Sequence, residues 1–240
     1  MRMVLTCVTV LVVILSGTFL VADDKQNVPA RNMSPVEIQA HFTQAQNFAE
    51  YGAYQDAVRE YKIVIAAAPN FAEAHFELGL VYVNTGRLDD AVRKFEKALE
   101  LNPNHARAPY ELALAYYDKD MSDEGIALCQ KYLMGHEDRG NLYSLLGVFY
   151  IKKGDTDKAI TEFKKQIKAG HHPEMGYLNL GMALVKKGNY DEAIEAFKES
   201  ISLNPRNPRV HYQLANAYEQ KGMKDEAERE MTEQKKLMHR

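Results

Sequence analysis

The chain repeats itself every 34 residues. Aligned with itself at this spacing, the sequence shows six copies, and no insertion interrupts them from the first copy to the last. The copies start at Ile38, Ala72, Ala106, Gly140, Glu174 and Pro208. A period of this length indicates small units that bury their apolar faces against their neighbours. The 240 residues therefore do not require two separate globular domains.

Small residues recur where two helices of each copy would cross. Every residue at the eighth and twentieth places is Ala or Gly: Ala45, Gly79, Ala113, Gly147, Gly181 and Ala215, then Ala57, Ala91, Gly125, Ala159, Ala193 and Ala227. Larger apolar residues surround them at helical spacings, as Leu180, Leu184 and Phe197 do in the fifth copy. In five copies a glycine separates the two helical stretches, where a helix commonly ends in the left-handed region. The pattern predicts six helix–turn–helix units.

This pattern resembles the tetratricopeptide repeat (TPR), a 34-residue helix–turn–helix unit. The resemblance covers residues 38 to 239 and rests on many places that agree in all six copies. It implies an all-α fold, a TPR α-solenoid in which the helix pairs form a right-handed superhelix. The expected repeats are 38–71, 72–105, 106–139, 140–173, 174–207 and 208–240.

The resemblance also implies which side chains face a partner. In TPR superhelices the first helix of each unit lines the concave surface, and the second, fifth, ninth, twelfth and thirteenth places face the groove. The residues that this implies for a partner-binding groove are Phe42, Phe76, Leu80, Val83, Tyr110, Leu114, Tyr117, Val148, Ile151, Leu178, Met182, Val185 and Tyr212. The ninth place is apolar in the four central copies and polar in the two terminal ones. The expected groove is apolar with polar ends, which suits an amphipathic helix or an apolar extended segment.

Two other interpretations of these residues stay open. The side chains can pack against the opposing helix or against each other, which leaves no open groove. Self-assembly, or the tether of a neighbouring copy, can also fill the channel.

The N-terminus has the order of an export segment. Arg2 precedes an uncharged, apolar stretch over residues 3–22, and Asp23 and Asp24 follow it. This order places the rest of the chain outside the cytoplasm. Residues 1–22 fit both a cleaved signal peptide and an uncleaved membrane anchor, because the stretch is about long enough to span a bilayer.

A polar linker and a helix cap follow the N-terminal stretch. Residues 23–37 form this part of the chain. Ser34 and Glu37 have the spacing of a capping box, with Pro35 at the first helical position. Ordered structure is expected to start there.

The third copy departs most from the common pattern. Pro109 lies in its first helix, Asp120 replaces the glycine of the turn, and Gly125 lies inside its second helix. A glycine in a helix interior costs about 1 kcal/mol relative to Ala. We expect this unit to be the softest joint of the array, although simple divergence explains the same differences. The charged last helix, from Asp225 to Met238, is expected to be a polar end cap.

The sequence offers no site for catalysis, a cofactor or a metal. Cys7 and Cys129 are the two cysteines, and Cys129 stands at a place where other copies carry Phe. Phosphate-binding, dinucleotide-binding, zinc-protease and nucleophile-elbow patterns are missing. Three histidines recur at one packing place of the repeat, so they indicate repetition and not a metal site. The net charge of −3 does not favour nucleic-acid binding.

The expected protein is a non-enzymatic interaction scaffold that binds other proteins on its concave face. It would act outside the cytoplasm, in the periplasm if the source is Gram-negative, either soluble or anchored to the inner membrane. Membrane contact is expected only through residues 3–22, if they are not cleaved. One alternative is a structural TPR protein that assembles with copies of itself into a homo-oligomer. The other is an assembly or stability factor of a cell-envelope machine such as a type IV pilus.

Overall fold

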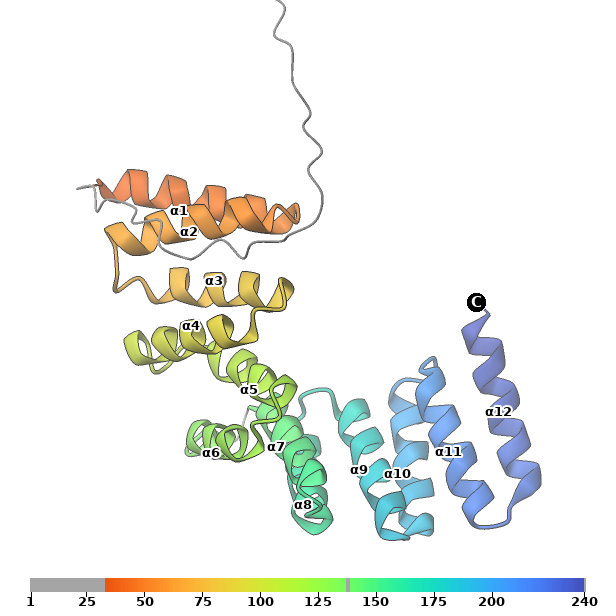
Figure 1. Cartoon of the computed structure of the whole chain (residues 1–240). Helices are drawn as coiled ribbons and strands as arrows, with labels where there is room; N and C mark the ends of the chain where they lie inside the picture. The colour runs from red at the N-terminus through yellow and green to blue at the C-terminus, as the bar shows by residue number, and fades with distance from the viewer. Residues whose placement is uncertain (1–32, 137–138, 240) are drawn as a thin grey trace, which may run out of the picture.

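Twelve α-helices form six antiparallel pairs in a computed structural model that describes residues 33–136 and 139–239. Figure 1 shows the pairs following one another along an open arc, from α1 at one end to α12 at the other. The helices are α1 (Pro35–Glu50), α2 (Tyr54–Ala67), α3 (Ala72–Asn84), α4 (Leu88–Leu101), α5 (Ala108–Asp118), α6 (Ser122–Leu133), α7 (Gly140–Lys152), α8 (Thr156–Lys168), α9 (Pro173–Lys187), α10 (Tyr190–Leu203), α11 (Pro208–Gln220) and α12 (Lys224–Met238). The described part contains no strand, and the prediction of an all-α TPR solenoid is confirmed.

The first helix begins at the predicted cap. The Glu37 backbone N–H donates to Ser34 Oγ at 3.3 Å, and the Ser34 backbone N–H donates to Glu37 Oε2 at 2.8 Å. Pro35 takes the first helical position, where its missing N–H removes nothing from the hydrogen-bond ladder. The capping box is therefore confirmed. Residues 1–22, with the expected export segment, lie outside the described residues, and no described helix is long and apolar enough to cross a bilayer.

The turn within each pair requires a left-handed residue. Five of these turns have a glycine with φ between 73° and 85°, as Gly86 has between α3 and α4. Asp120 fills the same position between α5 and α6 with φ of 62°, which is costly for a residue with a Cβ atom. The third pair therefore closes through a strained turn, in agreement with its divergence in sequence.

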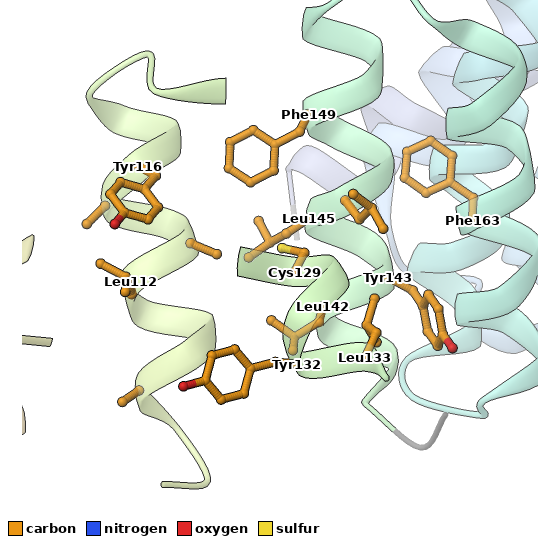
Figure 2. Close-up of a cluster of buried hydrophobic side chains, with 14 of the residues drawn as sticks. Leu112, Tyr116, Cys129, Tyr132, Leu133, Leu142, Tyr143, Leu145, Phe149 and Phe163 are labelled. Atoms are coloured by element: carbon orange, nitrogen blue, oxygen red, sulfur yellow. The ribbon is translucent and has the colours of Figure 1, made fainter. Parts of the chain in front are cut away.

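Aromatic rings pack onto the small residues at the helix crossings. In three pairs the Phe of the second helix lies against the Gly of the first helix, as Phe95 lies against Gly79. The third pair has no such Phe, because Cys129 stands in its place. Phe149, from α7 of the next pair, packs onto Gly125 of α6. Figure 2 shows the Phe149 ring among the buried side chains of this region. The sequence suggested that Gly125 merely weakens α6, whereas the structure gives it a packing role.

The odd-numbered helices line the inner side of the arc. Each odd-numbered helix contacts the next odd-numbered one, whereas the even-numbered helices of neighbouring pairs do not touch within the described residues. We call the surface formed by α1, α3, α5, α7, α9 and α11 the inner face.

Exposed ion pairs connect successive units. Four lysines at the ends of odd-numbered helices each reach an aspartate in the first turn of the second helix of the preceding pair: Lys119–Asp89, Lys153–Asp123, Lys187–Asp157 and Lys221–Asp191. Both charges also suit the helix dipoles at these ends. Such exposed pairs contribute little to stability individually. The first joint lacks this bridge, because Gln55 and Thr85 stand at its two places.

Candidate functional site: the inner face

Four apolar side chains form the centre of the inner face. Leu80, Leu114, Val148 and Met182 occupy the same place on α3, α5, α7 and α9, and we call them the inner row. Each packs against the core and keeps part of its surface exposed. Because they are 34 residues apart in equivalent helices, they lie on the same side of successive helices. The ninth place thus gives a partly exposed apolar residue in four consecutive units.

Further expected groove residues accompany the inner row. The partly exposed ones that also pack against the core are Val83, Tyr110, Tyr117, Ile151 and Val185. Tyr212, in the last unit, has 48% of its surface exposed. These six side chains are accessible to a partner, as are the four of the inner row. That a partner binds there stays a prediction.

Three expected groove residues belong to the core instead. Phe42 is 6% exposed, and Phe76 and Leu178 are fully buried. The Phe42 ring packs against Phe71 with ring centres 4.9 Å apart, and the Phe76 ring packs against Phe95 at 5.6 Å. Their assignment to the groove is therefore wrong, because a large side chain at the fifth place turns into the helix crossing. Only in the third and last units does this place carry a partly exposed tyrosine.

Polar side chains on the inner face connect neighbouring units. The Asn179 amide donates to Ser144 Oγ at 3.2 Å, and the Lys186 ammonium donates to the Ile151 carbonyl at 3.2 Å. The Arg209 guanidinium reaches Met182 Sδ at 3.7 Å. These contacts bring the inner helices of the last three units together.

Two half-buried carboxyls lie on the inner face of the second and third units. Burial raises the pKa of both Glu77 and Glu111, and the Arg107 guanidinium opposes this effect in each case. Arg107 Nη1 lies 3.7 Å from Glu77 Oε1, and its guanidinium stands 4.8 Å from the centre of the Phe76 ring. One guanidinium thus serves two carboxylates. The apolar pattern does not predict this acidic site, because Glu77 and Glu111 lie outside the hydrophobic places of the repeat.

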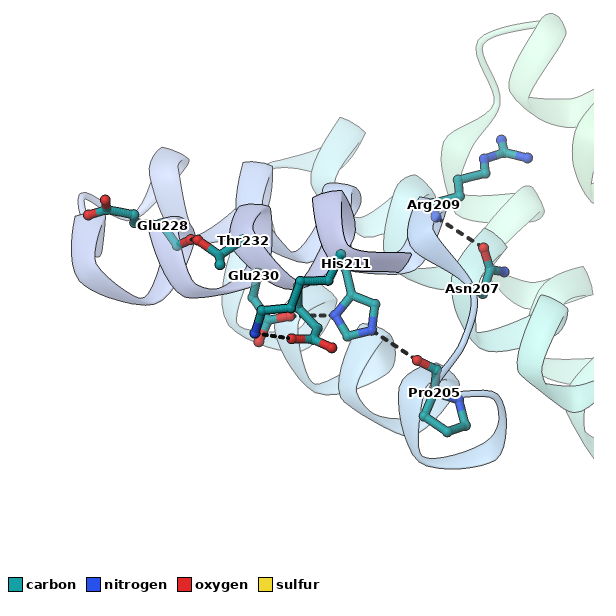
Figure 3. A network of polar contacts seen from close by, with 9 residues as sticks. Pro205, Asn207, Arg209, His211, Glu228, Glu230 and Thr232 are labelled. Carbon is teal, nitrogen blue, oxygen red and sulfur yellow. Dashed lines mark hydrogen bonds and ion pairs between the residues drawn. The ribbon is translucent and has the colours of Figure 1, made fainter. Parts of the chain in front are cut away.

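The histidines join helices and loops. Figure 3 shows the buried His211 between Glu230 of α12, at 2.7 Å from Nδ1, and the Pro205 carbonyl, at 3.3 Å from Nε2. His75 Nε2 donates in the same way to the Pro69 carbonyl at 3.0 Å. Within the described chain, no group of three or more His, Cys, Asp or Glu residues is placed to hold a metal ion. The recurring histidines therefore have a structural contact that their place in the repeat did not specify.

His105 is a structural residue that the repeat pattern missed. Its Nδ1 accepts hydrogen bonds from the Ala108 and Arg107 backbone N–H groups at 3.1 and 3.3 Å, and so caps α5. Its Nε2 donates to Glu73 at 3.0 Å, and its ring lies 4.4 Å from that of Phe76. His is not among the residues that commonly cap helices, so the sequence contained no clear signal for this contact.

Cys129 lies in a fully apolar setting. Its side chain is completely buried, and burial raises the pKa of its thiol to about 12. A thiol of this kind is protonated at neutral pH and does not act as a nucleophile. Figure 2 shows it beside Leu142 and Leu145 of the next unit, among side chains of the core.

Two depressions open at the ends of the array. One, of about 580 Å³, lies along α1 between Val36 and Asn47, and the other, of about 550 Å³, lies along α12 between Asp225 and Lys236. Neither depression includes a residue of the inner row.

Stacked helix pairs with a continuous inner face define the class of repeat solenoids, and the comparisons name the family. The chain belongs to the tetratricopeptide repeat family. Sequence models described as tetratricopeptide repeat match residues 72–105, 140–169 and 208–237, and one described as TPR repeat matches residues 177–222. No curated protein matches the chain in sequence.

Solved structures of TPR proteins have the same fold. MamA from Desulfovibrio magneticus RS-1, from residue 41 to its end, is 22% identical, with a TM-score of 0.64 over 70% of this chain and 96% of that one. PilF from Pseudomonas aeruginosa is 17% identical, with a TM-score of 0.69 over 83% and 91%. YrrB, described as a TPR protein with an unusual peptide-binding site, is 21% identical, with a TM-score of 0.57 over 74% and 91%. At these identities the likeness concerns the fold alone.

Proposed function

We propose that this protein is a non-enzymatic scaffold that binds segments of other proteins on its inner face, outside the cytoplasm. The TPR fold is typical of protein–protein interaction scaffolds. The observation that carries the proposal is the inner row, where four consecutive units each present a partly exposed apolar side chain. Monomeric proteins rarely expose large contiguous apolar patches without a partner.

The apolar surface of the inner row is suited to hydrophobic binding. Burial contributes roughly 25 cal/mol per Å² of apolar surface. Contact over about 400 Å² would therefore contribute near 10 kcal/mol, from which the large costs of association must be subtracted. An amphipathic helix or an apolar extended segment can make such a contact, because both present apolar side chains in a line.

The proposed location rests on the N-terminal sequence. An uncharged apolar stretch over residues 3–22, preceded by Arg2 and followed by two aspartates, has the order of an export signal. Fractionation of the source organism, with mass spectrometry of the N-terminal peptide, tests both export and cleavage. Recovery of the protein in the cytoplasm with residues 1–22 intact would contradict this part of the proposal.

A pair of substitutions on the inner row tests the binding surface. Leu114→Glu with Met182→Glu places two charges where the partner's apolar side chains would lie. We expect this double variant to lose the crosslinks that the natural protein forms with its partner in the source organism, as identified by mass spectrometry.

The matched control for this test uses Met134 and Leu203. They are 77% and 50% exposed and lie outside the inner helices, after α6 and at the end of α10. Met134→Glu with Leu203→Glu introduces the same changes and should keep the crosslinks. Circular dichroism shows whether all variants remain folded, and Leu114→Ala with Met182→Ala is the milder substitute if the charged pair unfolds. Partner capture that is equal for folded inner and control variants would refute the proposed surface.

A further inference from the structure

The charges of the inner helices separate by sign along the arc. Between their bounds, α1, α3 and α5 contain six acidic residues and no Lys or Arg: Glu37, Glu50, Glu73, Glu77, Glu111 and Asp118. The last three inner helices contain more basic than acidic residues: Lys152, Lys186, Lys187 and Arg209 against Glu174 and Glu219. Between their bounds, the inner helices are therefore acidic in the first three units and mildly basic in the last three, while Arg107 and Lys119 flank α5.

The acidic half has more negative charge than its own cations neutralise. Arg107, at the N-cap of α5, is the basic residue beside Glu77 and Glu111, and its side chain is still 57% exposed. The charges of Glu73 and Glu111 raise the pKa of Glu77 further, in addition to burial. The carboxylates thus repel each other in a partly desolvated setting, and an added cation would relieve this repulsion.

A buried hydroxyl beside these carboxylates also lacks a partner. Tyr61, on α2, is fully buried, and its hydroxyl makes no hydrogen bond within the described residues. Besides burial, the charges of Glu77 and Glu73 raise the pKa of Tyr61, so the hydroxyl lies within electrostatic reach of both. An unsatisfied buried donor is costly.

Apolar side chains adjoin the acidic positions on the same helices. Leu80 and Val83 share α3 with Glu77, while Leu114 and Tyr117 share α5 with Glu111. All four side chains are partly exposed. We propose that the first three units bind a basic amphipathic segment of a partner protein, with Lys or Arg side chains at Glu77 and Glu111 and apolar side chains on Leu80 and Leu114. This inference rests on the proposed function and specifies the partner's chemistry.

Charge complementarity selects this occupant over the alternatives. A nucleic acid or an anionic membrane would be repelled by six acidic residues. An acidic segment would be repelled for the same reason, and an uncharged one would leave the two half-buried carboxylates sharing Arg107 as their counter-charge. Lys186 and Arg209 disfavour the same basic segment at the other half of the inner face.

Three synthetic amphipathic helical peptides test the inference. They share one apolar side and carry Lys, Glu or Gln at every polar position, and their binding to the full chain is measured by fluorescence anisotropy. We expect the Lys peptide to bind most tightly. Its affinity should fall as salt is raised from low to physiological concentration. The double variant Glu77→Gln with Glu111→Gln should bind the Lys peptide roughly tenfold more weakly, since two ion pairs are lost. Lys186→Gln with Arg209→Gln is the control and should not weaken it.

The outcomes separate this inference from the proposed function. Equal binding of the three peptides, with loss of all three in Leu114→Glu, would overturn the charge inference and leave the binding surface standing. Failure of the Lys peptide to bind, or binding unaffected by the Glu77→Gln and Glu111→Gln pair, would also overturn the charge inference. Only the crosslinking test of the inner row decides the proposed function.

Discussion

The Phe149 ring lies in the space that a Cβ atom on Gly125 would occupy. The two residues belong to different units, Gly125 to α6 and Phe149 to α7. In three other pairs a Phe of the second helix lies on a Gly of the first helix within one unit, as Phe163 lies on Gly147. The contact at Gly125 thus joins two units, whereas those contacts lie within one unit.

Gly125→Ala is expected to destabilise the protein. In an ordinary helix interior the change would gain about 1 kcal/mol. Here the added methyl group would overlap the Phe149 ring, and overpacking of this kind costs typically about 1 to 3 kcal/mol. Urea denaturation measures the free energy of unfolding. The control is Ala127→Gly, at an exposed site of the same helix, which should lose only the propensity difference. A more stable Gly125→Ala variant would contradict this packing.

The stability of the protein should fall as the pH decreases through the range in which an unfolded histidine titrates. Burial lowers the pKa of His75 in the fold; Lys94 and Lys97 act in the same direction, and the Pro69 carbonyl and Glu100 oppose it. The histidine of the unfolded chain, with a pKa of about 6.5, therefore binds the proton more readily, and unfolding becomes easier below that pH. His75→Phe keeps an aromatic side chain and removes the titrating group. Its thermal midpoint should vary less between neutral and mildly acidic pH, and an identical pH profile would contradict the prediction.

The helix pairs themselves were predictable from local rules. Twelve Ala or Gly residues at two places, with Leu and aromatic residues around them, determine where the helices cross. The Ser34 and Glu37 spacing identified the first helix start. The contact at Gly125 was not predictable, because the ring that packs on it comes from another unit. Repeat periodicity describes each unit separately and does not predict which side chains of different units pack together.

Cys129 should resist alkylation in the native protein. Its thiol is fully buried, and burial raises its pKa to about 12, so little thiolate exists at mildly alkaline pH. A Cys7→Ser variant leaves Cys129 as the remaining thiol, and mass spectrometry counts the labels after treatment with iodoacetamide. Labelling should appear only after denaturation in urea. Rapid labelling of the folded variant would contradict this prediction and would show that the third unit opens readily.

Glu111→Gln should make the protein more stable at neutral pH. Burial raises the pKa of the Glu111 carboxyl, which means that its charged form is disfavoured in the fold. A group with a raised carboxyl pKa supports the fold when protonated, and this support is lost as the pH rises through the folded pKa. The amide removes the charge, so the thermal midpoint should rise at pH 7, and the gain should disappear under acidic conditions. Glu124→Gln, at an exposed site on α6, is the control and should change the midpoint little.

The inner face was predictable in part. The ninth and twelfth places correctly predicted side chains that remain accessible, because they lie on helices that line the inside of the arc. At the fifth place the prediction of groove residues was wrong for Phe42, Phe76 and Leu178. A position in the family pattern does not tell how far a large side chain turns into the helix crossing. The acidic half escaped notice because its residues lie at places that the hydrophobic pattern ignores. Their significance comes from partial burial, which only the folded chain shows.

The contact between Gly125 and Phe149 also limits how this array could have gained units in evolution and how it can be re-engineered. Tandem modules are usually treated as interchangeable blocks that can be duplicated, deleted or shuffled. Removing the fourth block would leave a hole beside Gly125, whereas copying the third block alone would create a second hole with no ring to fill it. The third and fourth units therefore have to stay together when the array is shortened or extended.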